Sequence, residues 1–324
     1  MAPAAAAIGG QIAQLVANPH SAFFKLPPPG FQRGIDFYPG SHLFKVMAIA
    51  THRYHEVHGR YPNFLKPELL TEKILWSNFF RLLRVGTTGN KLTTASFLPG
   101  ELDGQIAVPD TVWRSKTAGL PADTAIEPGL YYLKTNHGSD MFRRVAWPPA
   151  KAERRALQTA FAGHLRRSYG YWSGEWWYSC FERELFLERS VTSEKHPIAW
   201  CCYTFAGKVA LIIAYRKTDG ESETAWLNPD FTPQGWHNPA RRRTEFDRPP
   251  RALRDAMLKA AGTIGRPFSF VRVDFLLGDD GRLYLSELTF SPGNGLTPWP
   301  EELDRTIGGL WTLDQQPEDG SEVA

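Results

Sequence analysis

The stretch FSFVRVDFLLGDDGRLYLSELTFSPGNG, residues 268–295, holds two runs in which side chains of different polarity alternate. Such runs are typical of strands, and they are separated by the turn-forming residues Gly278-Asp279-Asp280-Gly281. The sequence therefore predicts a hairpin of residues 268–277 with residues 282–290.

The predicted hairpin brings two carboxylates to one face. Alternation places Arg272 and Asp274 on the same side of the first strand. A four-residue loop pairs Arg272 with Glu287 and leaves Asp274 diagonal to Glu287, about 7–8 Å away at Cα. Any even loop length keeps the two acids on a common face, and an odd one separates them.

Two interpretations of this face remain open. The carboxylates could converge on one cation, with Arg272 holding a phosphate, and the glycine-rich segment 291–295 would let backbone N–H groups approach an anion. Alternatively, Arg272, Asp274 and Glu287 form a buried ion-pair cluster that binds no ligand.

Composition limits the class of protein. The chain has 324 residues, of which 42% are hydrophobic and 22% charged, as in an ordinary globular protein. A net charge of +3 gives no general affinity for nucleic acid. The three cysteines show neither zinc-ligand spacing nor a disulfide framework. We find no signal peptide and no apolar run long enough to span a membrane, and we expect a cytoplasmic protein.

Along the rest of the chain, helical and strand patterns are mixed without strict alternation, which favours an α+β fold. Residues up to Tyr38 suggest a loosely docked arm. Helices are expected at 41–57, 67–83, 149–169 and 251–261, and strands at 106–113, 129–136, 185–191, 198–205 and 208–216.

Several segments, taken together and in order, resemble the TupA-like ATP-grasp family, which is named for teichuronopeptide biosynthesis. The strongest is VRVDFLLGDDGRLYLSELTFSPGNG. Others are YYLKTNHGSD (131–140), FLERSV (186–191) and FAGKVALIIAYR (205–216), with a weaker match in 73–93. Together they cover most of residues 70–312.

The resemblance implies an ATP-grasp fold, in which the nucleotide lies between two α+β subdomains. It suggests a helical N-terminal region (1–104), a central lid subdomain (105–187) and a C-terminal subdomain with the metal site (188–324). It also implies roles for individual residues. Those near Mg²⁺ would be Asp274 and Glu287, with Thr289 or Asn294 as a further ligand. Those near ATP would be Lys134, the lid-loop residues His137, Gly138 and Ser139, and Glu188 at the adenine. Those facing the transferred phosphoryl group would be Arg272 and Arg216.

The chain departs from the family pattern in two places. Where the family has an Asp-Tyr-Lys-like strand start, this chain has Ala199-Trp200-Cys201. The family's Lys-Leu-Thr-Asp-Lys becomes Lys91-Leu92-Thr93-Thr94-Ala95. Each change removes an acid and a lysine, for which Lys91 or Lys116 could substitute.

The function expected from the resemblance is ATP- and Mg²⁺-dependent carboxylate–amine ligation through an acyl phosphate. The partners would be a small-molecule or glycan carboxylate and an amine acceptor, together with polysaccharide-assembly enzymes. A glycan or small-molecule kinase on the same fold remains an alternative. A non-catalytic nucleotide-binding module is another, suggested by the missing acids and lysines.

Four other features carry less weight. His52, His55 and His58 look like a metal cluster, but the first and third do not face one another on a helix. The stretch 86–91 has the wrong glycine spacing for a P-loop. The aromatic residues of 169–178 are typical of a core, with sugar stacking as the alternative. The basic stretch 241–254 is read as a solvated loop that could also attract an anionic acceptor.

Overall fold

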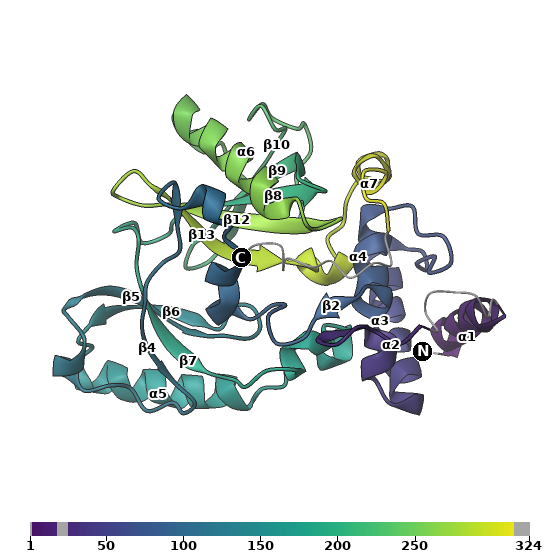
Figure 1. Ribbon diagram of the computed structural model, residues 1–324, viewed down its shortest axis with the longest axis horizontal. Helices are drawn as coiled ribbons and strands as arrows, with labels where there is room; N and C mark the ends of the chain where they lie inside the picture. The colour runs from purple at the N-terminus through teal and green to yellow at the C-terminus, as the bar shows by residue number, and fades with distance from the viewer. Residues whose placement is uncertain (1, 18–24, 314–324) are drawn as a thin grey trace.

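The computed structural model describes residues 2–17 and 25–313 and shows two β-sheets beside a group of helices (Figure 1). The smaller sheet lies below the larger one in this view, and the N-terminal helices lie to the right. Helices and sheets are mixed as the α+β prediction requires. None of the helices in the described residues is both long and apolar enough to cross a bilayer.

The larger sheet has seven strands and contains the predicted hairpin. Its order is β11 (Arg242–Arg243), β10 (Ser222–Leu227), β9 (Lys208–Lys217), β8 (Ala199–Phe205), β12 (Val271–Leu277), β13 (Leu283–Thr289) and β3 (Ile106–Ala107). Only the edge strands β11 and β3 pair in parallel with their neighbours.

The helix α6 (Arg251–Gly265) covers one face of this sheet (Figure 1). Alternation in β12 sends Val273 and Phe275 into a shared core with Ile264 of the helix. The other face carries Asp274 in the same strand, so this face is the one that can form a site.

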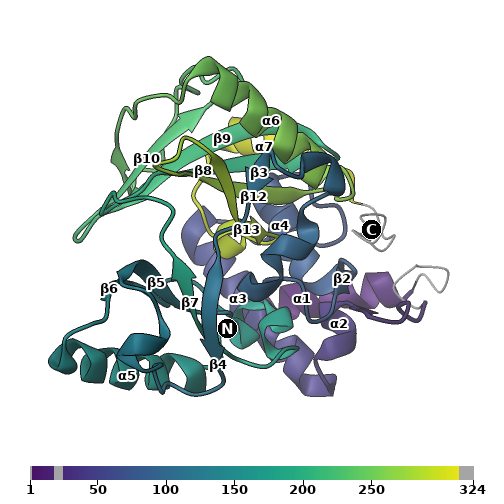
Figure 2. The same ribbon diagram turned by 60° about the vertical axis from the view of Figure 1, so that its left-hand side comes forward.

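The smaller sheet has four strands, in the order β4 (Thr111–Ser115), β7 (Leu185–Arg189), β5 (Gly129–Thr135) and β6 (Phe142–Trp147). The helix α5 (Lys151–Arg166) packs on it through Leu157 and Phe161, which lie one helical turn apart (Figure 2). The expected strand at 106–113 is in fact two strands, β3 and β4, which belong to different sheets.

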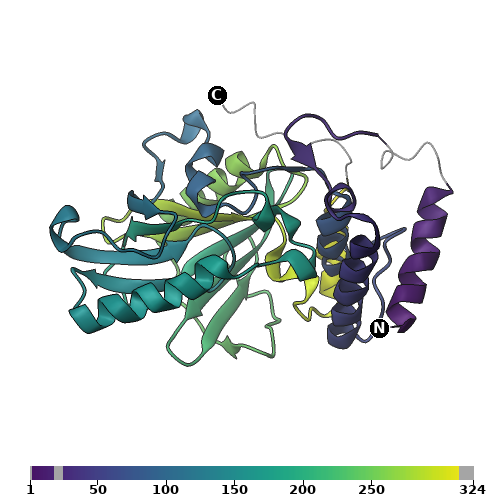
Figure 3. The same ribbon diagram turned by 90° about the horizontal axis from the view of Figure 1, so that it is seen from below.

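The helical region consists of α1 (Ala2–Val16), α2 (Gly34–Phe37), α3 (Gly40–His58) and α4 (Leu70–Phe80), with α7 (Glu301–Gly308) packed against α4 (Figure 3). The short strands β1 (Phe31–Gln32) and β2 (Leu83–Arg84) pair beside them. The expected loose arm is wrong for its first part, because α1 is a helix whose Ile8 is buried in the main core.

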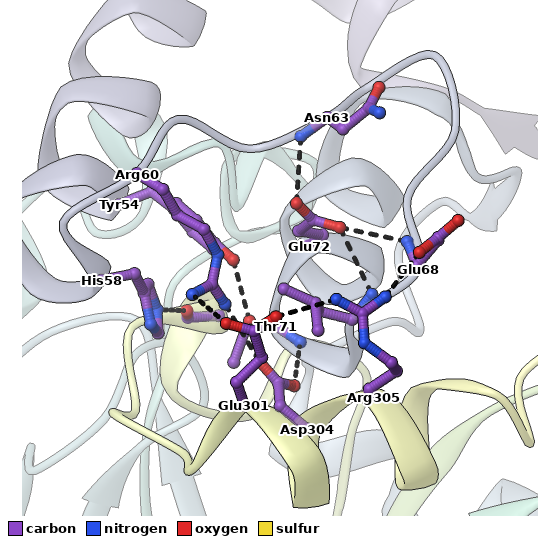
Figure 4. Close-up of polar contacts among 12 residues, drawn as sticks. Tyr54, His58, Arg60, Asn63, Glu68, Thr71, Glu72, Glu301, Asp304 and Arg305 are labelled. Carbon is purple, nitrogen blue, oxygen red and sulfur yellow. Dashed lines mark hydrogen bonds and ion pairs between the residues drawn. The ribbon is translucent and has the colours of Figure 1, made fainter.

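A buried polar cluster joins α3, α4 and α7 (Figure 4). The carboxylate of Asp304 accepts hydrogen bonds from the backbone N–H of Thr71 (2.9 Å) and from its hydroxyl (2.6 Å). The Tyr54 hydroxyl lies 2.9 Å from the same Thr71 oxygen. The ring of His58 contacts the carbonyl oxygen of Gly295 at 2.8 Å, so the cluster also anchors the loop that follows β13.

Candidate active site

The Asp274–Glu287 pair is at the centre of the site. The structure pairs these residues directly across β12 and β13, whereas the sequence placed them on a diagonal. Directly opposed side chains are closer, at about 4.5–5.5 Å between Cβ atoms. The two carboxylates therefore share a face, as expected, but they face each other more closely than predicted.

Two local features produce this register. Leu277 pairs with Leu283, so the connecting loop has five residues rather than the four predicted. An odd loop alone would send Glu287 to the opposite face. A bulge between Asp274 and Phe275 restores it, because Ser286 is left over as an extra residue. The Ser286 hydroxyl donates to the carbonyl oxygen of Asp274 at 3.0 Å and ties down the bulge.

Arg272 binds Asp274 through two hydrogen bonds. Its Nε lies 2.8 Å from Oδ1 and its Nη2 lies 2.5 Å from Oδ2. The expected pairing of Arg272 with Glu287 is wrong, because the shifted register sets Arg272 opposite Thr289, whose hydroxyl accepts from Nη2 at 3.0 Å. Burial raises the pKa of the Asp274 carboxyl, and the charge of Arg272 opposes that rise.

Lys91 is the basic partner of Glu287. Its ammonium lies 3.3 Å from Glu287 Oε1 and donates to the carbonyl oxygen of Gly138 at 2.5 Å. The residue begins η2 (Lys91–Phe97), far from β13 in sequence. From the sequence, Lys91 was expected only as one possible substitute for a missing lysine, since no local pattern reveals a contact across that separation.

Cys201 lies beside the acidic pair, directly opposite Asp274 on β8. The family pattern expects a lysine at this position. Burial raises the pKa of the Cys201 thiol well above its usual range, so the side chain is neutral. The basic side chain that binds Asp274 is thus Arg272.

Residues 136–140, which we call the lid turn, join β5 to β6 and lie beside Lys91. Asn136 fixes the turn: its Oδ1 accepts from Glu184 N at 2.9 Å and its Nδ2 donates to Glu182 O at 2.9 Å. Gly138 has a φ of +74°, and a Cβ there would lie 2.9 Å from the ring of Tyr169. The turn therefore requires glycine at this position.

The other predicted residues of the lid turn differ in exposure. Ser139 is exposed. His137 is fully buried, with its Nε2 3.3 Å from Arg167 O, so its ring supports the turn from below and does not line the site. Burial, and after it the charge of Arg183, lowers the pKa of His137 to about 4, which leaves the ring uncharged at neutral pH.

The lid turn also contacts the larger sheet through its last residue. Lys217, at the end of β9, donates to Asp140 Oδ1 at 2.6 Å. Lys91 and Lys217 thus link the turn to two places on the sheet face below it, and together they hold the two sheets against each other at this edge.

Lys134 and Glu188 form an ion pair on the smaller sheet. They lie on the neighbouring strands β5 and β7, and both are largely buried. Lys134 also lies over the ring of Tyr132, 5.3 Å from its centroid. The structure therefore brings together two residues that the resemblance assigned to the nucleotide.

Two predicted residues lie away from Asp274 and Glu287. Arg216 is on the α6 face of the sheet, where its Nε binds Glu223 Oε2 at 2.6 Å and its guanidinium covers Phe246. The strand position of Arg216 has the opposite parity to Ile213, the residue in line with Asp274, so in this arrangement Arg216 lies on the other face of the sheet.

Asn294 is also directed elsewhere. Its Oδ1 accepts from Asn78 Nδ2, and its Nδ2 donates to Ser173 O at 2.9 Å. Both ends of the amide are occupied inside the core, so this arrangement does not support Asn294 as a metal ligand. Thr289 does share the face of Glu287, two residues further along β13.

The donor chemistry of the pair fits Mg²⁺, which takes oxygen ligands and is commonly held by one or two carboxylates together with phosphate oxygens. Within residues 2–17 and 25–313, no group of three or more His, Cys, Asp or Glu side chains could hold a metal ion. The carboxylates of Asp274 and Glu287 would thus need oxygens from a bound phosphate to complete the coordination.

The histidines of α3 and the aromatic segment 169–178, which carried less weight in the sequence analysis, lie in separate surroundings or in the core. The three histidines of α3 have separate surroundings: His52 lies near Glu56, His55 stacks on Tyr61 and His58 contacts Gly295. In the aromatic segment, Trp176 and Trp177 are buried in the main core.

The family comparison covers the part of the chain that carries this hairpin. The family model described as TupA-like ATPgrasp matches residues 154–312. Over these residues the chain is similar to the TupA-like ATP-grasp family. The matched region includes β7 to α7, and with them Asp274, Glu287, Arg272 and Glu188. The lid turn and Lys91 lie before it.

Similar solved structures include ATP-grasp ligases. D-alanine–D-alanine ligase from Bacillus anthracis, complexed with ATP, is 17% identical over 69% of this chain and 64% of that chain, with a TM-score of 0.42. D-alanyl-alanine synthetase A from Vibrio cholerae is 16% identical over 67% and 60%, with a TM-score of 0.40. The ATP-grasp ligase PsnB with minimal precursor, Mg and ADP is 14% identical over 69% and 59%, with a TM-score of 0.34.

The chain spans less than two thirds of the length of each of these three proteins. No curated protein matches it.

Proposed function

We propose that the chain is an ATP- and Mg²⁺-dependent carboxylate–amine ligase. The observation that carries this proposal is the direct pairing of Asp274 with Glu287 across β12 and β13, with Lys91 connecting that pair to the lid turn. The pair lies within the segment that matches the ATP-grasp family model.

In the proposed reaction, a substrate carboxylate takes the γ-phosphoryl group of ATP, which gives ADP and an acyl phosphate. An amine then attacks the acyl carbon and releases phosphate. Asp274 and Glu287 would hold Mg²⁺, which when bound neutralises phosphate charge. Lys91, Lys134 and Arg272 are the side chains proposed to bind phosphate oxygens, and the Gly138 turn would exclude water from above.

The proposed setting is the assembly of a cell-surface polysaccharide or a related conjugate, with a glycan or small-molecule acid as substrate. The support is the resemblance to a family named for teichuronopeptide biosynthesis.

The test is formation of ADP from ATP and Mg²⁺ with a panel of carboxylic acids and amines. We expect ADP and an amide product with at least one combination. Asp274→Asn and Glu287→Gln should each lower turnover by roughly a hundredfold or more. Asp280→Asn, in the hairpin loop, removes a carboxylate away from the pair and should leave turnover unchanged. Absence of ADP with every acid would contradict the proposal.

A second candidate is a nucleotide-binding module without turnover. It is favoured by one observation: Arg272 and Lys91 already neutralise the two carboxylates, while Cys201 replaces the expected lysine. This candidate predicts that the chain binds an ATP analogue with the same Asp274 dependence but forms no ADP.

A further inference from the structure

A groove of about 800 Å³ opens at the β10 side of the larger sheet. Three segments line it: the β9–β10 turn at 220–222, the loop 238–242 that leads into β11, and the segment 293–298 that follows β13. Its volume is within the range of pockets that hold small molecules.

The groove lies on the face that carries Asp274. Trp226 pairs with Ile213, and Ile213 pairs with Cys201. Cys201 in turn pairs with Asp274, so these four side chains share one face. Ser222, which lines the groove, lies four residues before Trp226 on β10 and points the same way.

One wall of the groove has a side-chain amide whose N–H donors have no partner among the described residues. Asn238 is 7% exposed, and its Oδ1 accepts from Ala240 N at 2.9 Å, which fixes the orientation of the amide. With this orientation Nδ2 makes no hydrogen bond with any residue in the described parts of the chain, although Asn238 lines the groove. The amide N–H groups are therefore available to an acceptor that enters the groove.

The same wall has two guanidinium groups. Arg242 lies 3.4 Å from Glu223 and 3.6 Å from Glu221, so its charge is shared with carboxylates. Arg241 stacks on the ring of Tyr215, with Cζ 5.1 Å from the centroid, and forms no ion pair within the described residues. Its charge is held in place by stacking but is not neutralised.

The opposite wall offers polar groups as well. Gly293 is exposed with a φ of +59°, and the Thr297 hydroxyl lies so near that a Cβ at Gly293 would approach it to 2.7 Å. This wall is attached to β13, the strand of Glu287. A molecule in the groove would therefore contact the segment that continues from the acidic pair.

We infer that this groove binds an anionic small molecule through a carboxylate or phosphate group, held by Arg241 and Asn238. The role of this molecule rests on the proposed function, under which it is the substrate. The anionic group bound in the groove is then separate from the carboxylate that takes the phosphoryl group. A guanidinium and an amide N–H both donate to such an oxyanion, while the stacked Tyr215 keeps the guanidinium in place.

The test is equilibrium binding to the full chain, without nucleotide, of three anionic probes: L-glutamate, D-glucuronate and inorganic phosphate. The counterparts are L-glutamine, which lacks only the side-chain carboxylate of glutamate, and D-glucose, which has no carboxylate. We expect at least one anion to bind and its counterpart not to bind. Binding of glutamate or glucuronate alone assigns a carboxylate, and binding of phosphate alone assigns a phosphate.

Arg241→Ala and Asn238→Ala should each weaken that binding about tenfold or more. Arg243→Ala removes the same charge from a neighbouring exposed position that does not line the groove, and it should change the affinity less than twofold. Arg241→Ala alters an exposed side chain and keeps the test valid if Asn238→Ala fails to fold.

The inference is overturned if none of the three anions binds, or if Arg243→Ala weakens binding as much as Arg241→Ala. The binding assay contains no ATP, so its outcome is separate from that of ADP formation. Anion binding without ADP formation from any acid would contradict the proposed ligase activity and would support the anion site in the groove.

Discussion

Lys91 contacts both the acidic pair and the lid turn. Its side chain is 19% exposed, and its ammonium reaches both Glu287 and the carbonyl oxygen of Gly138. A partly buried ammonium in this position is a point charge that phosphate oxygens can share. Its importance rests on two contacts that join segments distant in sequence.

Replacing Lys91 with alanine should weaken nucleotide binding about tenfold, because it removes a charge-assisted contact. The measurement is titration with a fluorescent ATP analogue at fixed Mg²⁺. Lys116→Ala is the matched control, since Lys116 is 66% exposed and pairs with Glu182 outside the site. Equal affinities of the two variants would show that Lys91 has no specific role.

Among the elements, the turn between β5 and β6 depends most strongly on a single residue. Gly138 combines a positive φ with the close approach of Tyr169. Gly281, in the β12–β13 loop, has the same φ of +74° but nothing near its Cβ position. Alanine substitutions at these two positions therefore distinguish the effect of backbone strain from that of side-chain crowding.

Gly281→Ala should lower the free energy of unfolding by about 1 kcal/mol, from backbone strain alone. Gly138→Ala should lower it by a further 1–3 kcal/mol or so, because the methyl group overlaps the Tyr169 ring. Urea denaturation of both variants measures the difference. If the two variants lose equal stability, the Tyr169 ring moves aside freely and the turn is not held as described.

The junction of α4 and α7 should make stability depend on pH. Burial raises the pKa of Asp304 from 3.8 to about 6. The folded carboxyl therefore keeps its proton in a range where the unfolded chain has released it, and stability falls as pH rises from about 4 to 6. The loss amounts to roughly 3 kcal/mol at most.

Asp304→Asn should remove this fall, since the amide has no charge to bury. Urea unfolding at several pH values between 4 and 7 tests it, with Asp255→Asn, an exposed carboxylate of α6, as a control that should keep the wild-type trend. A parallel pH trend in wild type and Asp304→Asn would rule out Asp304 as the cause.

At the scale of the whole molecule, the sequence predicted what depends on local pattern. Alternation in 268–290 predicted the hairpin and the shared face of Asp274 and Glu287, and both are confirmed. The bulge at Ser286 could not be predicted, because it depends on how β13 fits its partner strand. The five-residue loop and the bulge each move Glu287 to the other face, and together they leave it on the predicted one. The shared face was therefore predicted correctly although the predicted register was wrong.

Contacts between segments that are distant in the chain could not be predicted from the sequence. The patterns gave no reason to place Lys91 against Glu287, or Lys217 against Asp140, since each pair joins different sheets or regions. The role expected for Arg216 was carried over from the resemblance, whereas its strand parity places it on the face opposite Asp274. Strands β6 and β10 were missed because no alternation marked them clearly.

The position of Lys91 has a thermodynamic consequence for the whole site. Its ammonium acts as an internal competitor for any cation that binds Glu287. If a cation displaced Lys91 from Glu287, the hydrogen bond from Lys91 to the Gly138 carbonyl oxygen would change as well. Cation binding and the position of the lid turn would then depend on each other. Such linkage is reciprocal: whatever fixes the turn alters the affinity of Glu287 for cations by the same factor. Under the proposed function, a cation that binds Glu287 would therefore release the positive charge of Lys91 toward the turn.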